Sequence, residues 1–326
     1  MIYNKEMTRE NRIFPSSYTD SLNLLNQSWL NNFTFSKVWQ LSGQLRFGQE
    51  NFIKKEEYSF YRVSNNKVIC LNYFDFKNKS VLTDACSTLF INSKVIEFKY
   101  MNKSSLDLNI LIHNLQHRFG KNYCTQIVEE WDSPLLILNN KDFPNFESYI
   151  NTFSQRLKRT IRKIKEYKIY KPLHYSYSSS NDKITNLQLW LNALQIDVNS
   201  WKKWESSNMD VLQREDLQYI FPLILEPEYF SLAVSMVDTY PVAFSLMGKS
   251  RHMWFSIKWG CHQKYRPYFL GIDLMLNHLQ YLHNLSLQEK DLYYIVDFWG
   301  KNNEVYSQIA NAHIERCHIN IVDTIS

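Results

Sequence analysis

Runs of alternating apolar and polar residues predict several strands in the first half of the chain. Each run mixes β-branched and aromatic residues with polar ones and is bounded by Asn, Lys or Ser. The predicted strands are Tyr58–Val63, Lys67–Phe74, Val95–Tyr100, Cys124–Trp131 and Leu135–Leu138. Between them, Leu106–Phe119 carries apolar residues at helical spacing, and Gly120 follows as a helix C-cap. The first half is therefore predicted to mix helices and strands.

A polar, proline-containing stretch at residues 139–147 predicts a domain boundary. We place one domain at residues 1–140 and a second at residues 141–326. The second opens with a helix over Phe146–Lys168, which contains neither Gly nor Pro. After the polar stretch Ser176–Asp182, another helix is predicted around Ile184–Leu194.

Beyond residue 230 the pattern becomes an ordered series of strands and helices punctuated by glycines. Four of the seven glycines of the chain, at positions 248, 260, 271 and 300, lie at the predicted turns. The predicted strands are Phe230–Val237, Pro241–Gly248, Arg251–Trp259, Leu292–Phe298 and Cys317–Val322. Helices are predicted at Leu270–Asn284 and Asn303–Ala312. This β-β-β-α-β-α-β order predicts an α/β domain with a mixed sheet.

Composition narrows the class of protein. Of 326 residues, 44% are hydrophobic and 21% are charged, which is typical of a globular protein. The five cysteines are odd in number and no two have CxxC spacing, so neither a disulfide framework nor a zinc site is expected. No apolar run is long enough for a membrane span, and the N-terminal residues lack the apolar core of a signal peptide. We therefore expect a cytoplasmic location and no bound metal.

The helix at residues 153–168 concentrates positive charge on one side. Its apolar stripe is Leu157, Ile161 and Ile164, and cations including Arg159 and Arg162 surround the stripe. A solvated helix face explains this pattern as well as an anion-binding surface does. If the face binds a partner, the candidates are coenzyme phosphates, an acidic carrier protein and tRNA.

The loop that precedes the helix at residue 270 has the composition of a phosphate-binding turn. It is expected to supply Gly260, Lys264, Arg266, Gly271 and Ile272, because the first turn of a helix presents N–H groups and a positive dipole end to an anion. Asp273 adds a negative charge in the same turn. A β-loop-α turn of this kind is common in α/β proteins, so the pattern alone does not specify a nucleotide.

Four side chains are candidates for acid and base chemistry. His262 titrates near neutral pH, and Tyr265 lies in the same loop. Asp297 ends an apolar strand, and Tyr306 follows on a short helix. Each has a structural alternative, as an exposed loop residue, a turn cap or a core aromatic. We expect Trp201, Lys202 and Trp254 to line the acceptor side of the cleft.

Residues from about 133 to 322 resemble the FemAB-like, CelD-type branch of the GNAT acyltransferase superfamily. The motifs that carry the resemblance keep the family's order and spacing. They are Asp132-Ser-Pro134, the basic helix, Ser200-Trp-Lys202, Pro241-Val-Ala-Phe244, the Gly271 segment, and Asp297-Phe-Trp-Gly300 with Tyr306. The chain departs from the family at Phe269-Leu270, at Cys261-His262 and at Ser307.

The resemblance implies tandem GNAT-like domains and an N-acyltransferase activity that relies on positioning more than on a side-chain nucleophile. Acyl-CoA or an acyl carrier protein is the implied donor, as a co-substrate and not a permanently bound cofactor, and a small-molecule or peptide amine is the acceptor. A second hypothesis is an aminoacyl transferase that uses aminoacyl-tRNA, as other FemAB-like proteins do. A third is a GNAT-like binding scaffold without activity, which the departures around Gly271 favour.

Overall fold

The computed structural model describes most of the second half of the chain and much of the first. The described residues are 52–55, 58–70, 79–90, 92–103, 106–119, 123–178, 182–200, 230–250, 253–298 and 300–323. Within these ranges, no helix has the length and apolar character needed to cross a membrane. The predicted residues Gly120, Trp201 and Lys202 lie outside the described part.

One mixed sheet runs through both halves of the molecule. Its strand order is β1-β2-β3-β4-β11-β5-β10-β9-β8-β7-β6. The strands of the first half are β1 (Phe52–Lys55), β2 (Tyr58–Ser64), β3 (Lys67–Cys70) and β4 (Val95–Asn102). Those of the second half are β6 (Leu173–Tyr177), β7 (Phe230–Val237), β8 (Tyr240–Ser250), β9 (Met253–Cys261) and β10 (Tyr293–Asp297). The two remaining strands, β5 (Tyr123–Asn139) and β11 (Ala312–Asp323), join the halves.

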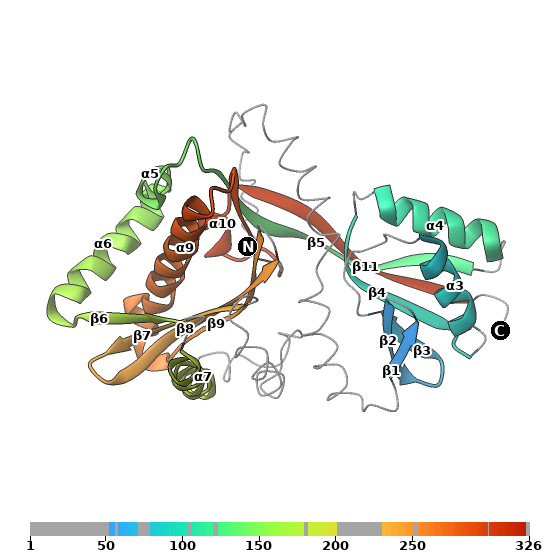
Figure 1. Ribbon diagram of the computed structural model, residues 1–326, viewed down its shortest axis with the longest axis horizontal. Coiled ribbons are helices and arrows are strands. Elements are labelled where there is room, and N and C mark those ends of the chain that lie inside the picture. Colours follow the sequence, from blue (N-terminus) through green and yellow to red (C-terminus); the bar gives the residue numbers. More distant parts are fainter. Residues whose placement is uncertain are drawn as a thin grey trace, which may run out of the picture.

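Strands β5 and β11 form a long antiparallel ribbon that connects the two halves of the molecule (Figure 1). We call this connecting region the waist. Their register runs from Ala312 opposite Leu135 to Asp323 opposite Tyr123, and β11 also pairs with β4. The last strand of the second half thus completes the sheet of the first half. The domain boundary at residue 140 stays a prediction. Strands β5 and β11 lie on opposite sides of this boundary in the sequence and pair with one another in the sheet.

The two strands predicted at Cys124–Trp131 and Leu135–Leu138 are one continuous strand, β5. Pro134 does not interrupt it, although proline lacks the N–H that a central strand needs. Its carbonyl accepts a hydrogen bond from the N–H of Phe298 at 3.1 Å, so Pro134 faces the β10 side just beyond the last paired residue, Asp297. The missing N–H of Pro134 therefore removes no hydrogen bond from the ladder between β5 and β10.

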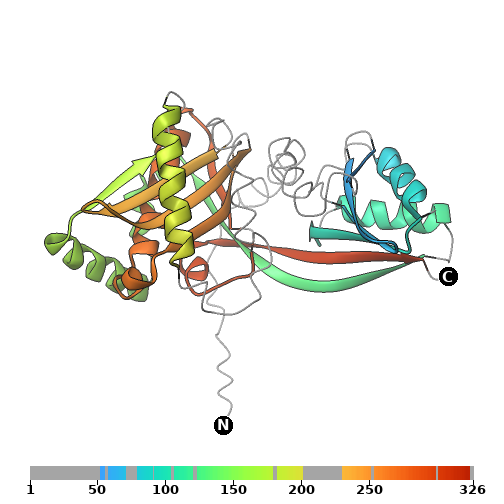
Figure 2. The same cartoon turned by 90° about the horizontal axis from the view of Figure 1, so that it is seen from below.

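Helices cover both faces of the sheet in the second half (Figures 1 and 2). One face carries α5 (Phe146–Ile150), α6 (Gln155–Tyr170), α9 (Leu270–Gln288) and α10 (Tyr306–Ile309), and the other carries α7 (Lys183–Val198). The α9 core includes Leu138, Met275 and Val296, and the α7 core includes Trp190 and Phe244. In the first half, α3 (Lys79–Phe90) and α4 (Leu106–Phe119) pack over β3, β4 and β11.

The helix predicted over Phe146–Lys168 is divided in two. Asn145 caps α5 through Ser148 N–H at 2.9 Å, and Ser154 caps α6 through Leu157 N–H at 3.3 Å. A second N-cap inside an apolar periodic run starts a new helix because it satisfies donors that the first turn leaves without partners. The predicted stripe is confirmed: Leu157 and Ile164 are buried, and Ile161 is half-buried.

Candidate functional site

Strands β9 and β10 separate soon after they begin to pair. Their parallel ladder covers only Met253, Trp254 and Phe255 of β9, opposite Ile295, Val296 and Asp297 of β10. Beyond this point β9 continues to Cys261 and keeps its pairing with β8. The chain after β10 turns away toward α10. Beyond Phe255 this edge of β9 has no strand partner among the described residues up to Cys261, and an unpaired strand edge is a place where a ligand can bind.

A β-bulge lies in β9 at the point of separation. Leu246 of β8 is opposite Lys258, but the next residue, Met247, is opposite Ser256, so Ile257 is an extra residue in β9. An extra residue shifts the alternation of side chains between the two faces of the sheet. Ser256 and Trp259 therefore both point toward α10, although three positions separate them.

The phenol of Tyr306 lies against this bulge. Its Oη is 3.4 Å from Ser256 Oγ, and the indole of Trp259 also forms a hydrogen bond with it. The ring stacks on Phe298, with centroids 4.5 Å apart. Burial raises the pKa of Tyr306 to about 12, so its proton is retained throughout the neutral range. The structure thus places a protonated hydroxyl at the separation point of β9 and β10.

Asp297 ends β10 beside the same point, and it forms a buried ion pair with Arg316 of β11. Arg316 Nη2 and Asp297 Oδ2 are 2.5 Å apart, and both side chains are 0% exposed. A carboxylate and a guanidinium can remain charged at such depth only when they neutralise one another. The pair ties the end of β10 to the ribbon at the waist.

The other two candidates for acid and base chemistry, His262 and Tyr265, lie at the far end of β9. At about 3.3 Å per residue, His262 is about 20 Å along the strand from Ser256. His262 caps the 3₁₀ helix η5 (Gln263–Tyr268), with its Nδ1 accepting from the N–H of Lys264 at 3.2 Å. Burial, together with Lys264, lowers the pKa of His262. The four predicted catalytic residues therefore form two separate groups.

The first turn of α9 is already occupied by hydrogen bonds within the chain. The N–H of Gly271 donates to the Cys261 thiol, and the N–H groups of Ile272 and Asp273 donate to Phe269 O at 3.0 and 3.1 Å. A Cβ on Gly271 would lie 3.0 Å from Cys261 Cβ, so the glycine allows the helix to approach β9 closely. These bonds leave little of the helix terminus available to a pyrophosphate.

Asp273 faces away from solvent and into a polar cluster. Its carboxylate accepts hydrogen bonds from Lys168 at 3.0 Å, from Asn277 at 3.3 Å and from the hydroxyl of Tyr175. Burial and the neighbouring carboxylate raise the pKa of Tyr175. Asp273 thus holds α9 to α6 and β6. It also places a carboxylate in the turn that was predicted to bind a phosphate.

The remaining residues predicted for the phosphate site are distributed around η5 and β9. Lys264 and Arg266 are exposed on η5. Gly260 is buried within β9, where an added Cβ would lie 2.6 Å from the ring of Phe244. Trp254 is only 6% exposed and belongs to the core beneath α9, with Lys249 Nζ 5.5 Å above its ring.

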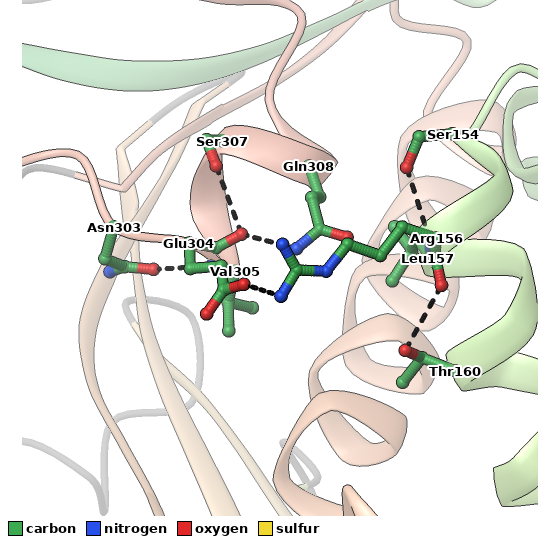
Figure 3. A network of polar contacts seen from close by, with 9 residues as sticks. All are labelled: Ser154, Arg156, Leu157, Thr160, Asn303, Glu304, Val305, Ser307 and Gln308. Atoms are coloured by element: carbon green, nitrogen blue, oxygen red, sulfur yellow. Dashed lines mark hydrogen bonds and ion pairs between the residues drawn. The ribbon is translucent and has the colours of Figure 1, made fainter. Parts of the chain in front are cut away.

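The basic helix α6 begins next to the α10 segment and crosses the start of α9. Arg156 forms an ion pair with Glu304, two residues before Tyr306 (Figure 3). Lys163 Nζ lies 6.0 Å from the ring centroid of Phe269, at the start of α9. Between them, Arg159 and Arg162 are exposed, and neither forms an ion pair with a residue that the structure describes. Between its contacts with the α10 segment and with the start of α9, helix α6 therefore carries positive charge that no described carboxylate neutralises.

A pocket of about 180 Å³ with several acidic residues lies at the waist, next to Arg316 of the buried ion pair. Its lining residues are Lys103, Glu130, Trp131, Asp132, Glu315 and Arg316. Lys103 pairs with Glu130 at 2.7 Å, which leaves Asp132 and Glu315 as the excess negative charge. Arg316 both lines this pocket and contacts Asp297, so the pocket and the separation point share one side chain.

The sequence pattern gave no sign of Arg316, Ser256, Trp259 or the bulge. An arginine in an amphipathic strand is usually a surface residue. Arg316 is buried because β11 pairs with β5, a strand about 180 positions earlier in the chain, and the local sequence does not show this pairing. The one available signal was the apolar surroundings of Asp297, since a carboxylate in such a run requires a cation. Among the described residues, no three His, Cys, Asp or Glu side chains are grouped to hold a metal ion.

Comparisons with known proteins show the fold. No protein-family model matches the sequence, and no curated protein matches it. The structure of FemX superposes with a TM-score of 0.56 at 9% identity, covering 92% of this chain and 96% of that one. L-PGS from Bacillus licheniformis gives a TM-score of 0.52 at 10% identity, covering 94% of this chain and 92% of that one.

A further match is the C-terminal domain of an Agrobacterium fabrum protein described as a lysylphosphatidylglycerol synthetase. Its TM-score is 0.51 at 8% identity, and the match covers 89% of this chain and 92% of that one. The fold is FemAB-like and GNAT-like. The predicted fold class, a mixed α/β sheet of the GNAT-like kind, is therefore confirmed, whereas the division into two domains and the CelD-type branch stay predictions.

Proposed function

We propose that this chain is an acyltransferase whose reaction centre is the separation point of β9 and β10. The observation that carries the proposal is the protonated hydroxyl of Tyr306, held by Ser256 and Trp259 at the bulge. Acyl transfer needs a proton for the leaving oxygen or sulfur and a donor group for the developing oxyanion. Tyr306 supplies the proton, and the backbone of the bulge at Ile257 is the candidate oxyanion donor.

In this reaction the amine of the acceptor attacks the acyl carbonyl carbon. A C–N bond forms, and the bond from the acyl carbon to the donor oxygen breaks. The proton of the Tyr306 hydroxyl passes to the departing oxygen, and the amine releases a proton that restores the phenol. The acidic pocket at the waist is the candidate site where the acceptor first binds as an ammonium ion, because Asp132 and Glu315 favour a cation. The ammonium loses one proton to solvent and then attacks as the neutral amine.

For the donor, the contacts favour an aminoacyl-tRNA over a CoA thioester. The N–H groups that would hold a pyrophosphate are bonded within the chain, and Asp273 adds negative charge there. The open cations Arg159 and Arg162 instead suit the extended phosphate backbone of an RNA stem. The name of the Agrobacterium neighbour refers to an aminoacylated lipid, which is consistent with aminoacyl transfer.

The test is binding of aminoacyl-tRNA across a range of salt concentrations. Neutralising a cation that contacts phosphate lowers the slope of log K against log salt by about 0.7–0.9. The double variant Arg159→Gln/Arg162→Gln should therefore lower the slope by about 1.4–1.8. The control Lys94→Gln/Lys183→Gln removes the same charge from exposed lysines away from α6 and should leave the slope unchanged.

Transfer is measured in parallel with aminoacyl-tRNA and with a panel of CoA thioesters. Tyr306→Phe should lower the rate of transfer without changing tRNA affinity. Salt-independent binding of a CoA thioester, with no binding of tRNA, would overturn the donor assignment. Transfer by Tyr306→Phe at the wild-type rate would overturn the assignment of the reaction centre.

A further inference from the structure

Several large apolar side chains are exposed together at one end of the second half. Ile169 and Tyr170 at the end of α6 are 76% and 83% exposed, Tyr240 at the start of β8 is 55% exposed, and Tyr268 at the end of η5 is 47% exposed. We call these four residues the tyrosine tip. Exposed tyrosines and an isoleucine gathered at one place are unusual on a monomeric surface and indicate a contact site.

The hydrogen-bond ladders place the elements of the tyrosine tip side by side. Leu173, at the start of β6, pairs with Val237, at the end of β7, so the link from α6 to β6 lies next to the turn before Tyr240. The rings of Tyr167 and Tyr268 lie 4.5 Å apart, which joins η5 to the last turn of α6. In Figure 1 the end of α6 and the start of β6 form the edge of the molecule farthest from the first half.

Positive charge surrounds the tyrosine tip. Lys163, Lys171, Lys264 and Arg266 are exposed on α6, on the α6–β6 link and on η5. The exposed carboxylates nearby are Glu166 on α6 and Asp238 on the turn between β7 and β8. Lys168, also on α6, is neutralised by the buried Asp273. The surface around the tip therefore carries a net positive charge beside its apolar side chains.

We propose that the tyrosine tip docks on the surface of an anionic lipid bilayer. Tyrosine favours the bilayer interface because its ring is apolar and its hydroxyl stays hydrated. Ile169 reaches below the headgroups, while the neighbouring lysines stay at the level of the lipid phosphates. Anionic lipid then adds an attraction that grows with each cation near the surface.

The contacts at the tip favour a bilayer over unpaired RNA bases. Bases stack on open aromatic faces, but Tyr167 and Tyr268 already lie against one another. The most exposed residues are Ile169 and Tyr170, and an isoleucine offers no stacking surface. Docking at the tip is independent of the acyl donor, since the tip lies beyond η5 and away from Tyr306.

The test is co-sedimentation of the full chain with lipid vesicles. One set contains phosphatidylcholine alone, and the other also contains about one-third phosphatidylglycerol. Binding should require phosphatidylglycerol and weaken with added salt. Ile169→Ser/Tyr170→Ser should lower the partition constant at least about tenfold. Lys171→Gln/Lys264→Gln should lower it about fivefold for each lysine.

The control is Ile184→Ser/Leu191→Ser, which removes two exposed apolar side chains from α7, on the other face of the sheet. It should bind vesicles like the wild type, and all variants should keep the wild-type circular dichroism spectrum. Equal loss of binding in the tip and control variants would overturn the proposal. So would an absence of vesicle binding, or a tip variant that loses tRNA binding while keeping vesicle binding.

Discussion

The buried pair of Asp297 and Arg316 gives the sharpest prediction about this fold. Asp297→Asn removes the negative charge and keeps the shape of the side chain. The Arg316 guanidinium then stays at 0% exposure without its counter-charge. Removing one partner of such a pair is strongly destabilising, because the remaining charge stays buried without the counter-ion that it contacts directly.

The magnitude follows from the geometry. The nearest atoms are 2.5 Å apart, and the charge on a guanidinium is spread over several atoms, so the charge centres are separated by about 4 Å. At an effective dielectric constant of about 20, that separation corresponds to about 4 kcal/mol. We therefore expect Asp297→Asn to lower the free energy of unfolding by about 3–5 kcal/mol.

The assay is urea unfolding followed by tryptophan fluorescence, applied to a double-mutant cycle. The cycle comprises the wild type, Asp297→Leu, Arg316→Met and the double variant. The double variant should regain most of the lost stability, because neither charge remains buried. A coupling energy within about 0.5 kcal/mol of zero would refute the reasoning. If Asp297→Asn instead removes activity and leaves unfolding unchanged, Asp297 acts as a base, as the sequence suggested.

Three further outcomes are expected. Tyr306→Phe should lower the rate of acyl transfer by about 10²–10⁴-fold. Because the pKa of Tyr306 is about 12, a pH–rate profile of the wild type should show no loss of rate below about pH 11. Gly260→Ala places a Cβ 2.6 Å from the Phe244 ring and should cost about 1–3 kcal/mol in thermal denaturation, while Gly300→Ala, with its nearest contact at 3.9 Å, should be nearly neutral. Burial lowers the pKa of His278 to about 3, so on acidification the unfolded chain binds this proton before the folded chain does. The free energy of unfolding should therefore fall by about 1.4 kcal/mol per pH unit between about pH 6.5 and about pH 3.

For each of these predictions, a specific result would contradict it. An alkaline limb near pH 9 would show that Tyr306 is not held as a neutral phenol. Equal melting temperatures for the two alanine variants would mean that Gly260 is not confined by Phe244. His278 lies between the hydroxyls of Ser231 and Ser245, at 2.8 and 2.9 Å, and His278→Gln should flatten the acid limb of the unfolding profile. An unchanged limb would assign the acid sensitivity to other groups.

Local pattern determined many of the helices and strands in both halves of this protein. The strand predicted at Phe230–Val237 and the helix predicted at Leu106–Phe119 have the bounds that the structure shows. The amphipathic stripe of α6 identified the face that packs and the face that stays charged. These features depend on periodicities of two and 3.6 residues, which a short window of sequence contains.

The tertiary structure alone decided how the candidate site is assembled. The strand that buries Arg316 against Asp297 comes from the end of the chain and pairs with β5 across the waist. The bulge at Ile257 appears only in the register between β8 and β9, and it turns Trp259 toward Tyr306. Gly271 marked a turn in the sequence, but the fold gives its N–H to Cys261. Register and ion pairing depend on residues distant in sequence, so no local periodicity encodes them.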